Sequence, residues 1–144
     1  MIETDTIKLL RECDAGIQMG VKSIKDVEGY VKSPQLKKTL ENCKSEHEKL
    51  STEVESLLHR YEDAGKNPNP MVEGMSWMKT EMKMMMEHSD HTIADLMTDG
   101  CNMGVKSLNR YLNQYEAADE KSKDIAKRLI HLEEQLATDM RDFL

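Results

Sequence analysis

Met19-Gly20-Val21-Lys22-Ser23 occurs a second time, unchanged, as Met103-Gly104-Val105-Lys106-Ser107. The two copies are 84 residues apart, a spacing too long for the repeats of a solenoid. Flanking residues extend the match: Gly16 with Gly100 at the same spacing, and Thr6-Ile7 with Thr92-Ile93 at nearly the same distance upstream. The repeat predicts two related helical hairpins, residues 1–64 and about 89–144, within one domain. Residues 65–88 join them.

The composition favours helices over sheets. The chain of 144 residues has one Phe, one Trp and four Tyr against twelve Met. Strands favour aromatic and β-branched residues, whereas Met, Leu, Lys and Glu are good helix formers. A chain of this length can bury roughly two thirds of its unfolded surface in one core. We therefore expect a single all-α domain that needs no disulfide or metal to fold.

Charge and hydropathy exclude two classes of partner. The formal net charge is −7 and no basic cluster interrupts the mixed charge, whereas nucleic-acid binding requires a basic stripe. No apolar run approaches the ~20 residues that a membrane span requires, and the first residues lack a signal pattern. Cys13, Cys43 and Cys101 form no Cys-x-x-Cys pair, which favours reduced, buried thiols. We expect a cytoplasmic protein without nucleic-acid or membrane partners.

Apolar residues recur at three- and four-residue intervals in the first hairpin, which predicts helices over about Thr6–Val31 and Pro34–Tyr61. Ser33 can cap the second helix, with Pro34 at its first position. Gly16 and Gly20 lie four residues apart, a spacing that lets another backbone approach. The second helix carries the most regular stripe: Leu36, Leu40, Cys43, His47, Leu50, Val54, Leu57 and Tyr61. His47 is thus expected in the core.

The joining segment and the second hairpin show the same periodicity. Gly65 is a helix-ending signal, and residues 67–70 read as a rigid linker. Methionines then recur with helical spacing up to residue 86, beside Trp77, which predicts a methionine-faced crossover helix. Ser89 or Asp90 can cap a third helix, with a second turn between residues 116 and 122. The last helix has the stripe Ile125, Leu129, Leu132, Leu136, Met140 and Phe143.

Two antiparallel hairpins joined by a long crossover make a four-helix bundle in which helix three runs parallel to helix two. With a repeat across it, this arrangement resembles the ferritin-like superfamily. It is most similar to small bacterial ferritin-like domains of unknown function, which carry paired Asp-x-Gly-like stretches on helices one and three. The resemblance covers nearly the whole chain and rests on the architecture and on the pattern at residues 16–23 and 100–107.

The resemblance implies a di-iron site built from glutamates and two Glu-x-x-His motifs. No histidine here has a glutamate three residues before it; those positions hold Lys44, Ser56, Met85, His88 and Arg128. The inward positions of helix three, Cys101, Val105 and Leu108, carry no carboxylate, and the stripe chosen for helix four is apolar. The sequence therefore predicts that the di-iron site is absent, together with its ferroxidase, oxygenase and reductase chemistry.

Two other groups of residues are candidate metal ligands. His47, with Cys43 one turn away, Cys101 opposite and Asp14 nearby, would suit a single borderline metal such as Zn²⁺. The alternative, which we favour, is that His47 is a neutral core residue hydrogen-bonded to Asp14 or Ser23. The cysteines would then act as small hydrophobic residues.

The second group lies in residues 82–91, where Met85, His88 and His91 offer the soft ligands that Cu(I) prefers. The three- and four-residue spacing of the methionines is what packing requires and metal binding does not. We therefore favour a packing role there, or a dimer interface. His59 and His131 lie off the core stripes and are expected in solvent.

No catalytic motif appears: the chain has no glycine-rich phosphate loop, no Gly-x-Ser-x-Gly and no Cys-x-x-Cys. The sequence favours a non-enzymatic structural or protein-interaction module without a cofactor, in the form of a homodimer. The alternative is a metal-binding or metal-handling protein that uses either ligand group.

Overall fold

The computed structural model describes residues 2–61 and 89–144, which form an all-helical structure without strands. The elements are α1 (Ile2–Glu28), α2 (Pro34–Arg60), α4 (Asp90–Gln114), α5 (Glu120–Met140) and the short 3-10 helix η1 (Arg141–Phe143). The expected all-α class is confirmed.

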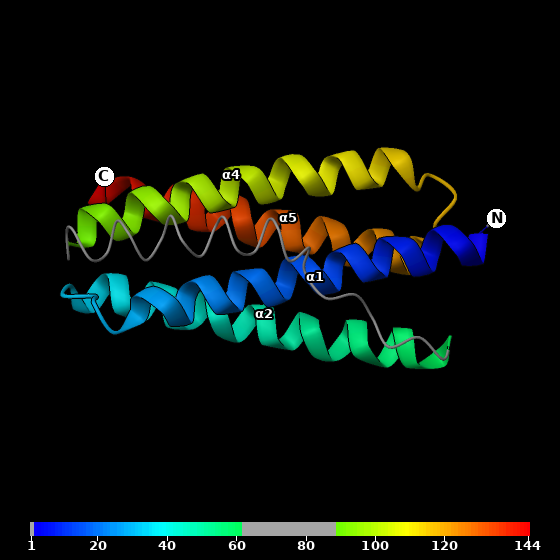
Figure 1. Ribbon diagram of the computed structural model, residues 1–144, viewed down its shortest axis with the longest axis horizontal. Helices are drawn as coiled ribbons and strands as arrows, with labels where there is room; N and C mark the ends of the chain where they lie inside the picture. The colour runs from blue at the N-terminus through cyan, green and yellow to red at the C-terminus, as the bar shows by residue number, and fades with distance from the viewer. Residues whose placement is uncertain (1, 62–88) are drawn as a thin grey trace.

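The four long helices lie side by side as two antiparallel hairpins (Figure 1). α1 and α2 form one, α4 and α5 the other, and α2 runs in the same direction as α4. The expected helix end at Gly65, the rigid linker, the methionine-faced helix and Trp77 lie outside the described residues. The bundle of two hairpins is therefore established, and the crossover that would make it ferritin-like is not described.

Three helices begin at a residue whose side-chain oxygen accepts a hydrogen bond from the third amide of its helix, which satisfies a donor left without a helical partner. The bonds run from Leu36 N to Ser33 Oγ (3.3 Å), from Thr92 N to Ser89 Oγ (3.1 Å) and from Ser122 N to Asp119 Oδ1 (2.8 Å). The predicted caps Ser33 and Ser89 are confirmed, and Asp119 fixes a start that the sequence left open. α1 ends at Glu28, earlier than predicted, because the chain turns at residues 29 and 30.

The first turn of each hairpin caps the loop of the other hairpin. The start of α1 accepts hydrogen bonds from the α4–α5 loop, and the start of α4 accepts them from the α1–α2 loop. The bonds are Ala117 N to Asp5 Oδ2 (3.1 Å), Asp119 N to Thr6 Oγ1 (2.9 Å), Lys32 N to Asp90 Oδ1 (2.8 Å) and Ser33 N to Asp90 Oδ2 (2.9 Å). These reciprocal bonds fix the axial alignment of the hairpins.

The apolar core consists of two clusters, each supplied by all four long helices. The first includes Leu9, Leu58, Leu108 and Leu129, and the second includes Ile24, Leu40, Ile93 and Leu136. On α2, His47 separates Cys43 of the second cluster from Leu50 of the first. Glu133 occupies the corresponding place on α5. A buried polar layer thus lies between the two apolar halves of the bundle.

Candidate functional site

His47 is the centre of this polar layer, and the structure places it in the core as predicted, with 1% of its surface exposed. Its Nδ1 lies 2.8 Å from the carbonyl oxygen of Cys43, one turn earlier on α2. Its Nε2 lies 2.9 Å from Oε1 of Glu133 on α5. Both ring nitrogens are therefore engaged, and the partners are not the expected Asp14 or Ser23.

These contacts determine where the protons lie. A carbonyl oxygen can only accept, so Nδ1 of His47 must carry a hydrogen and donate it to Cys43. The bond between Nε2 and Glu133 holds one further proton. If that proton is on the ring, the pair is an imidazolium beside a carboxylate; if it is on Glu133, both groups are neutral. In either form the pair has a net charge of zero, which is why it can be buried.

The repeated sequence motif contacts this pair directly. A Cβ atom built on Gly20 would lie 2.8 Å from Nε2 and 2.9 Å from Cδ2 of His47, closer than carbon atoms can approach. A Cβ atom on Gly104, the same residue of the second copy, would lie 3.5 Å from Oε2 of Glu133. Each copy of the motif therefore lies against the buried polar residue of its own hairpin. Gly20 makes room for a side chain, and not for a backbone as the sequence suggested.

The surroundings shift the pKa values of the buried groups. Burial disfavours the charged form of His47, but the hydrogen bonds that the charged ring donates to Cys43 and Glu133 outweigh this effect and raise the pKa of His47 to about 10. Burial raises the pKa of the Cys101 thiol well above its usual range, and the neighbouring Glu133 carboxylate raises it further. Burial also raises the pKa of Cys13 to about 12, with help from Glu12 and Asp14. Cys13 and Cys101 are thus poor nucleophiles at neutral pH.

The first predicted metal group is brought together in part. Cys43 Sγ lies 3.5 Å from His47 Nδ1, and Cys101 is near enough to Glu133 for that carboxyl group to raise the pKa of its thiol. Asp14 is buried on α1 but accepts a hydrogen bond from Gln18 at 3.0 Å. Over residues 2–61 and 89–144, no three His, Cys, Asp or Glu side chains are arranged to hold a metal ion. The three cysteines are free and buried, as predicted.

Of the second predicted metal group, Met85, His88 and His91, the structure describes only His91. Met85 and His88 lie outside the described residues. His91, in the first turn of α4, is exposed. His59 and His131 are also exposed, which confirms that they lie off the core stripes.

Glu133 is the buried residue that the sequence reasoning missed. The predicted stripe of the last helix used Leu132, but Leu132 is only half-buried and Glu133 is 9% exposed. Leu129, Glu133, Leu136 and Met140 have the four-three-four spacing of a core stripe, so apolarity was given more weight than spacing. The available signal was this spacing, because the equivalence of Glu133 with His47, each 13 residues after the first residue of its helix, depends on the α5 start that only the structure gives.

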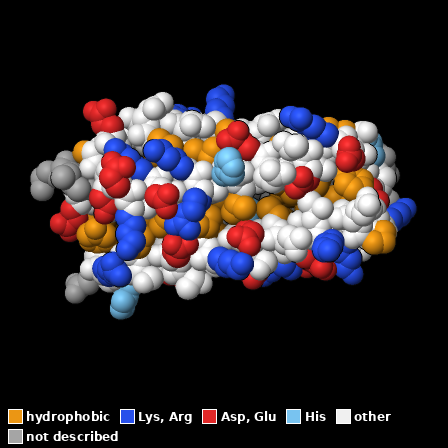
Figure 2. Space-filling view, turned by 180° about the vertical axis from the view of Figure 1, so that it is seen from behind, with side chains coloured by type: hydrophobic (Ala, Val, Ile, Leu, Met, Phe, Trp, Pro, Cys, Tyr) orange, Lys and Arg blue, Asp and Glu red, His pale blue; other side chains and the backbone are white. Residues whose placement is uncertain are grey.

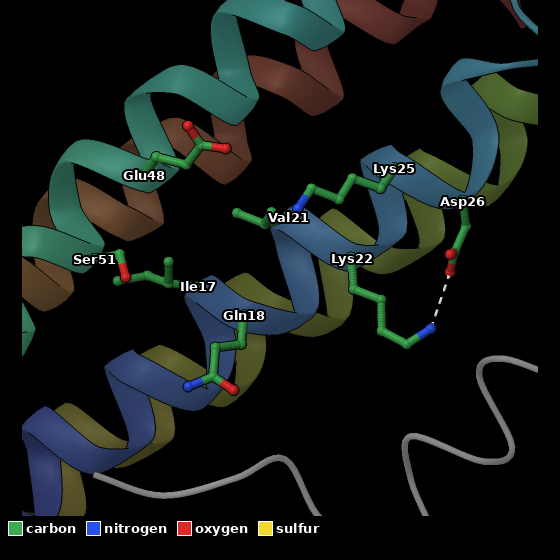
Figure 3. Close-up of a pocket in the computed structure, with 8 residues that line it drawn as sticks. All are labelled: Ile17, Gln18, Val21, Lys22, Lys25, Asp26, Glu48 and Ser51. Carbon is green, nitrogen blue, oxygen red and sulfur yellow. Dashed lines mark hydrogen bonds and ion pairs between the residues drawn. The ribbon is translucent and has the colours of Figure 1, made fainter. Parts of the chain in front are cut away.

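One surface groove lies between α1 and α2 (Figure 3), with a volume of about 450 Å³. Its lining residues are Ile17, Gln18, Val21, Lys22, Lys25, Asp26, Glu48 and Ser51. Lys22 is paired with Asp26 at 3.4 Å, and the Ser51 hydroxyl donates to Glu55 at 3.4 Å. The lining therefore mixes both signs of charge, and its one hydroxyl faces a carboxylate and not an activating imidazole.

Comparisons of the chain with protein-family models, curated proteins and solved structures find no match. No helix in the described parts of the chain is both long and apolar enough to cross a membrane.

Proposed function

We propose that this protein is a cytoplasmic, non-enzymatic helical bundle of ferritin-like architecture that acts as a structural or protein-interaction module. The observation that carries the proposal is the saturation of the buried polar site. Both ring nitrogens of His47 are engaged, one by a carbonyl and one by Glu133. Within the described residues, every buried side-chain nitrogen or oxygen has a hydrogen-bond partner. A catalytic base needs a lone pair directed at a substrate, and this ring offers none.

The described surface supports a role in association. Figure 2 shows one face of the molecule, where acidic and basic side chains are interspersed and apolar side chains form a broken band along the long axis. Three large apolar residues of the described chain are exposed: Met103 (63%), Leu144 (54%) and Tyr30 (41%). Met103 belongs to the repeated motif. A surface of interspersed charges with exposed apolar residues between them is suited to binding another protein. We propose that the other protein is a second copy of the same chain.

A metal-binding role is the second candidate, because Cys43 and Glu133 both lie within hydrogen-bond distance of His47 and all three side chains can bind a metal. In the described residues these side chains are not arranged as a metal site. A Zn²⁺ ion there would have to replace the hydrogen bond between His47 and Glu133 and release its proton. The saturated pair therefore disfavours this candidate.

Elemental analysis tests the proposal, on protein purified without chelator or immobilised metal and with the native mass measured on the same sample. We expect a metal content far below one ion per chain, and a native mass equal to that of two chains. A stoichiometric metal that is lost in His47→Gln but retained in His59→Gln would overturn the proposal and establish the second candidate. His59→Gln is the matched control because His59 lies on the same helix but is exposed.

A further inference from the structure

His47 and Glu133 occupy the same position in the two halves of the molecule. Each follows the first residue of its helix, Pro34 or Glu120, by 13 residues. Each contacts the glycine of its own copy of the repeated motif. The contact between them joins the two hairpins at the point where equivalent positions meet. If one hairpin were paired with a copy of itself, this position would meet its own duplicate.

Five other buried positions are shared between α2 and α5 by the same spacing. The pairs are Leu36 with Ser122, Leu40 with Ala126, Cys43 with Leu129, Leu50 with Leu136 and Val54 with Met140. None of these ten residues is a carboxylic acid or a basic side chain. The loop caps do not distinguish the hairpins either, because each hairpin has an aspartate, Asp5 or Asp90, that accepts hydrogen bonds from the loop of the other. Two copies of one hairpin could cap each other's loops in the same way. Among the buried positions that α2 and α5 share, the one held by His47 and Glu133 is therefore the one at which the two hairpins differ in charge.

Self-pairing would place incompatible groups at that position. Two copies of hairpin one would bring two imidazoles together, each with Nδ1 already donating to a carbonyl. Each Nε2 would then be an acceptor, so a hydrogen bond between the two rings would require an extra proton and would bury a net positive charge. Two copies of hairpin two would bring two carboxyl groups together. With one shared proton they would bury a net negative charge, and a neutral pair would require both to be protonated at a pH far above the usual pKa of a glutamate. Unpaired buried charge is strongly destabilising, whereas the His47–Glu133 pair is neutral overall.

We propose that the His47–Glu133 pair is the specificity determinant of hairpin recognition, and that it directs hairpin one to hairpin two either within a chain or in a second copy of the chain. The second copy is thus a partner that exchanges hairpins. This inference rests on the proposed interaction function. α2 ends and α4 begins at opposite ends of the bundle, about 40 Å apart for helices of this length (Figure 1). The 27 residues between Tyr61 and Ser89 can reach about 90 Å when extended, enough to enter a second copy.

The test uses full-length chains in which the charges are changed one at a time. His47→Glu places two carboxyl groups at the buried position, and Glu133→His places two imidazoles there. We expect each variant alone to unfold at much lower urea concentration than the wild type. The double variant His47→Glu/Glu133→His recreates the pair in reverse and should recover most of the lost stability. Glycines lie beside both positions, so the exchanged side chains have room.

Mixing the two single variants is the decisive step. When His47→Glu and Glu133→His are refolded together, exchange of hairpins restores one His–Glu pair at each of two interfaces. We expect a heterodimer by native mass spectrometry, in excess over random pairing, with the urea midpoint of the double variant. Two isotopically distinguishable batches of the chain with Gln at both positions are the control, because amides pair equally well in every combination; these batches should mix only at the random proportion.

Three outcomes would overturn the inference. The single variants are as stable as the wild type, or the mixture yields no heterodimer, or the Gln control shows the same preference. If the single variants do not fold alone, rescue by mixing remains the readout, and its failure counts against the inference. The metal content of the wild type tests the proposed function separately, so that failure of one proposal is distinguishable from failure of the other.

Discussion

Gly20 of the repeated motif lies against the ring of His47 and leaves no room there for a larger residue. Glycine in a helix interior normally costs about 1 kcal/mol relative to alanine, so Gly→Ala usually stabilises a helix. At Gly20 a methyl group would meet the ring of His47 at 2.8 Å, and that ring is held by hydrogen bonds at both nitrogens. The cost of displacing the ring exceeds the gain in helix propensity.

We therefore predict that Gly20→Ala lowers the free energy of unfolding by about 1–3 kcal/mol, the usual range for overpacking a core. Gly104→Ala is the matched control, because its nearest contact would be an ordinary 3.5 Å. It should be neutral or stabilising by up to about 1 kcal/mol. Urea unfolding of both variants measures the difference. Equal effects would show that His47 does not fill the space beside Gly20.

The raised pKa of His47 predicts how stability depends on pH. The pKa is about 10 in the folded protein and 6.5 for an unperturbed histidine. The folded state thus keeps a proton that the unfolded state loses between these values. The contribution is fully present below pH 6.5 and is lost as pH rises towards 10, with a slope of up to about 1.4 kcal/mol per pH unit.

Urea unfolding of the wild type and of His47→Gln, measured between pH 6 and 9.5, checks this prediction. The difference between the two curves reports on the His47–Glu133 pair as a unit, because the titrating groups outside the pair are common to both. We expect the wild type to lose its advantage as pH rises. A difference that stays constant, or grows, would show that the folded pair does not retain a proton that the unfolded chain loses.

At the scale of the elements, the reciprocal loop caps join the hairpins. Asp90 accepts two backbone hydrogen bonds from the α1–α2 loop, whereas Asp5 accepts one from the α4–α5 loop. Hydrogen bonds to a charged acceptor contribute about 1.5–3 kcal/mol when well formed and less when exposed. The α1–α2 loop should therefore depend strongly on Asp90.

We predict that Asp90→Ala costs about 1–2 kcal/mol and that amide hydrogen exchange accelerates at Lys32 and Ser33. Asp124→Ala is the control, since Asp124 pairs only with the neighbouring turn through exposed Arg128. It should leave both amides protected. Unchanged exchange at Lys32 and Ser33 in Asp90→Ala would contradict the assigned cap.

At the scale of the whole molecule, all four long helices contribute to both apolar clusters. Neither half of the bundle can lose its packing without disturbing every helix, so the bundle should unfold as one cooperative unit. The polar layer of His47 and Glu133 lies between the clusters but does not divide them into domains.

Large-to-small changes in the two clusters test this. Leu9→Ala in the first cluster and Ile24→Ala in the second both remove fully buried side chains. Each should cost about 2–5 kcal/mol and shift a single unfolding transition. Circular dichroism and hydrogen exchange should report the same midpoint. Separate transitions, of which each variant moves only one, would show that the two halves unfold independently.

The four long helices of the described chain, most of their boundaries and their pairing into hairpins could all be predicted from local sequence pattern. Helical periodicity and end caps act within a few residues, so Ser33, Pro34 and Ser89 could be read as helix starts without the structure. The burial of His47, Cys43 and Cys101 also followed from the spacing of their stripes. The repeat at residues 19–23 and 103–107 identified two related halves.

The contact between His47 and Glu133 could not be predicted from the sequence and depends on how the helices pack together. Glu133 is 86 residues away, and it looked like a surface carboxylate because apolar Leu132 stood beside it. A carboxylate enters a core only when another helix supplies its partner, and that partner cannot be read from the spacing on its own helix. Likewise, the closeness of Gly20 to the ring of His47 depends on how α1 packs on α2. Helical periodicity and end caps act locally and could be read from the sequence. The site around His47 requires charges and shapes on different helices to match, and this matching arises only when the helices pack.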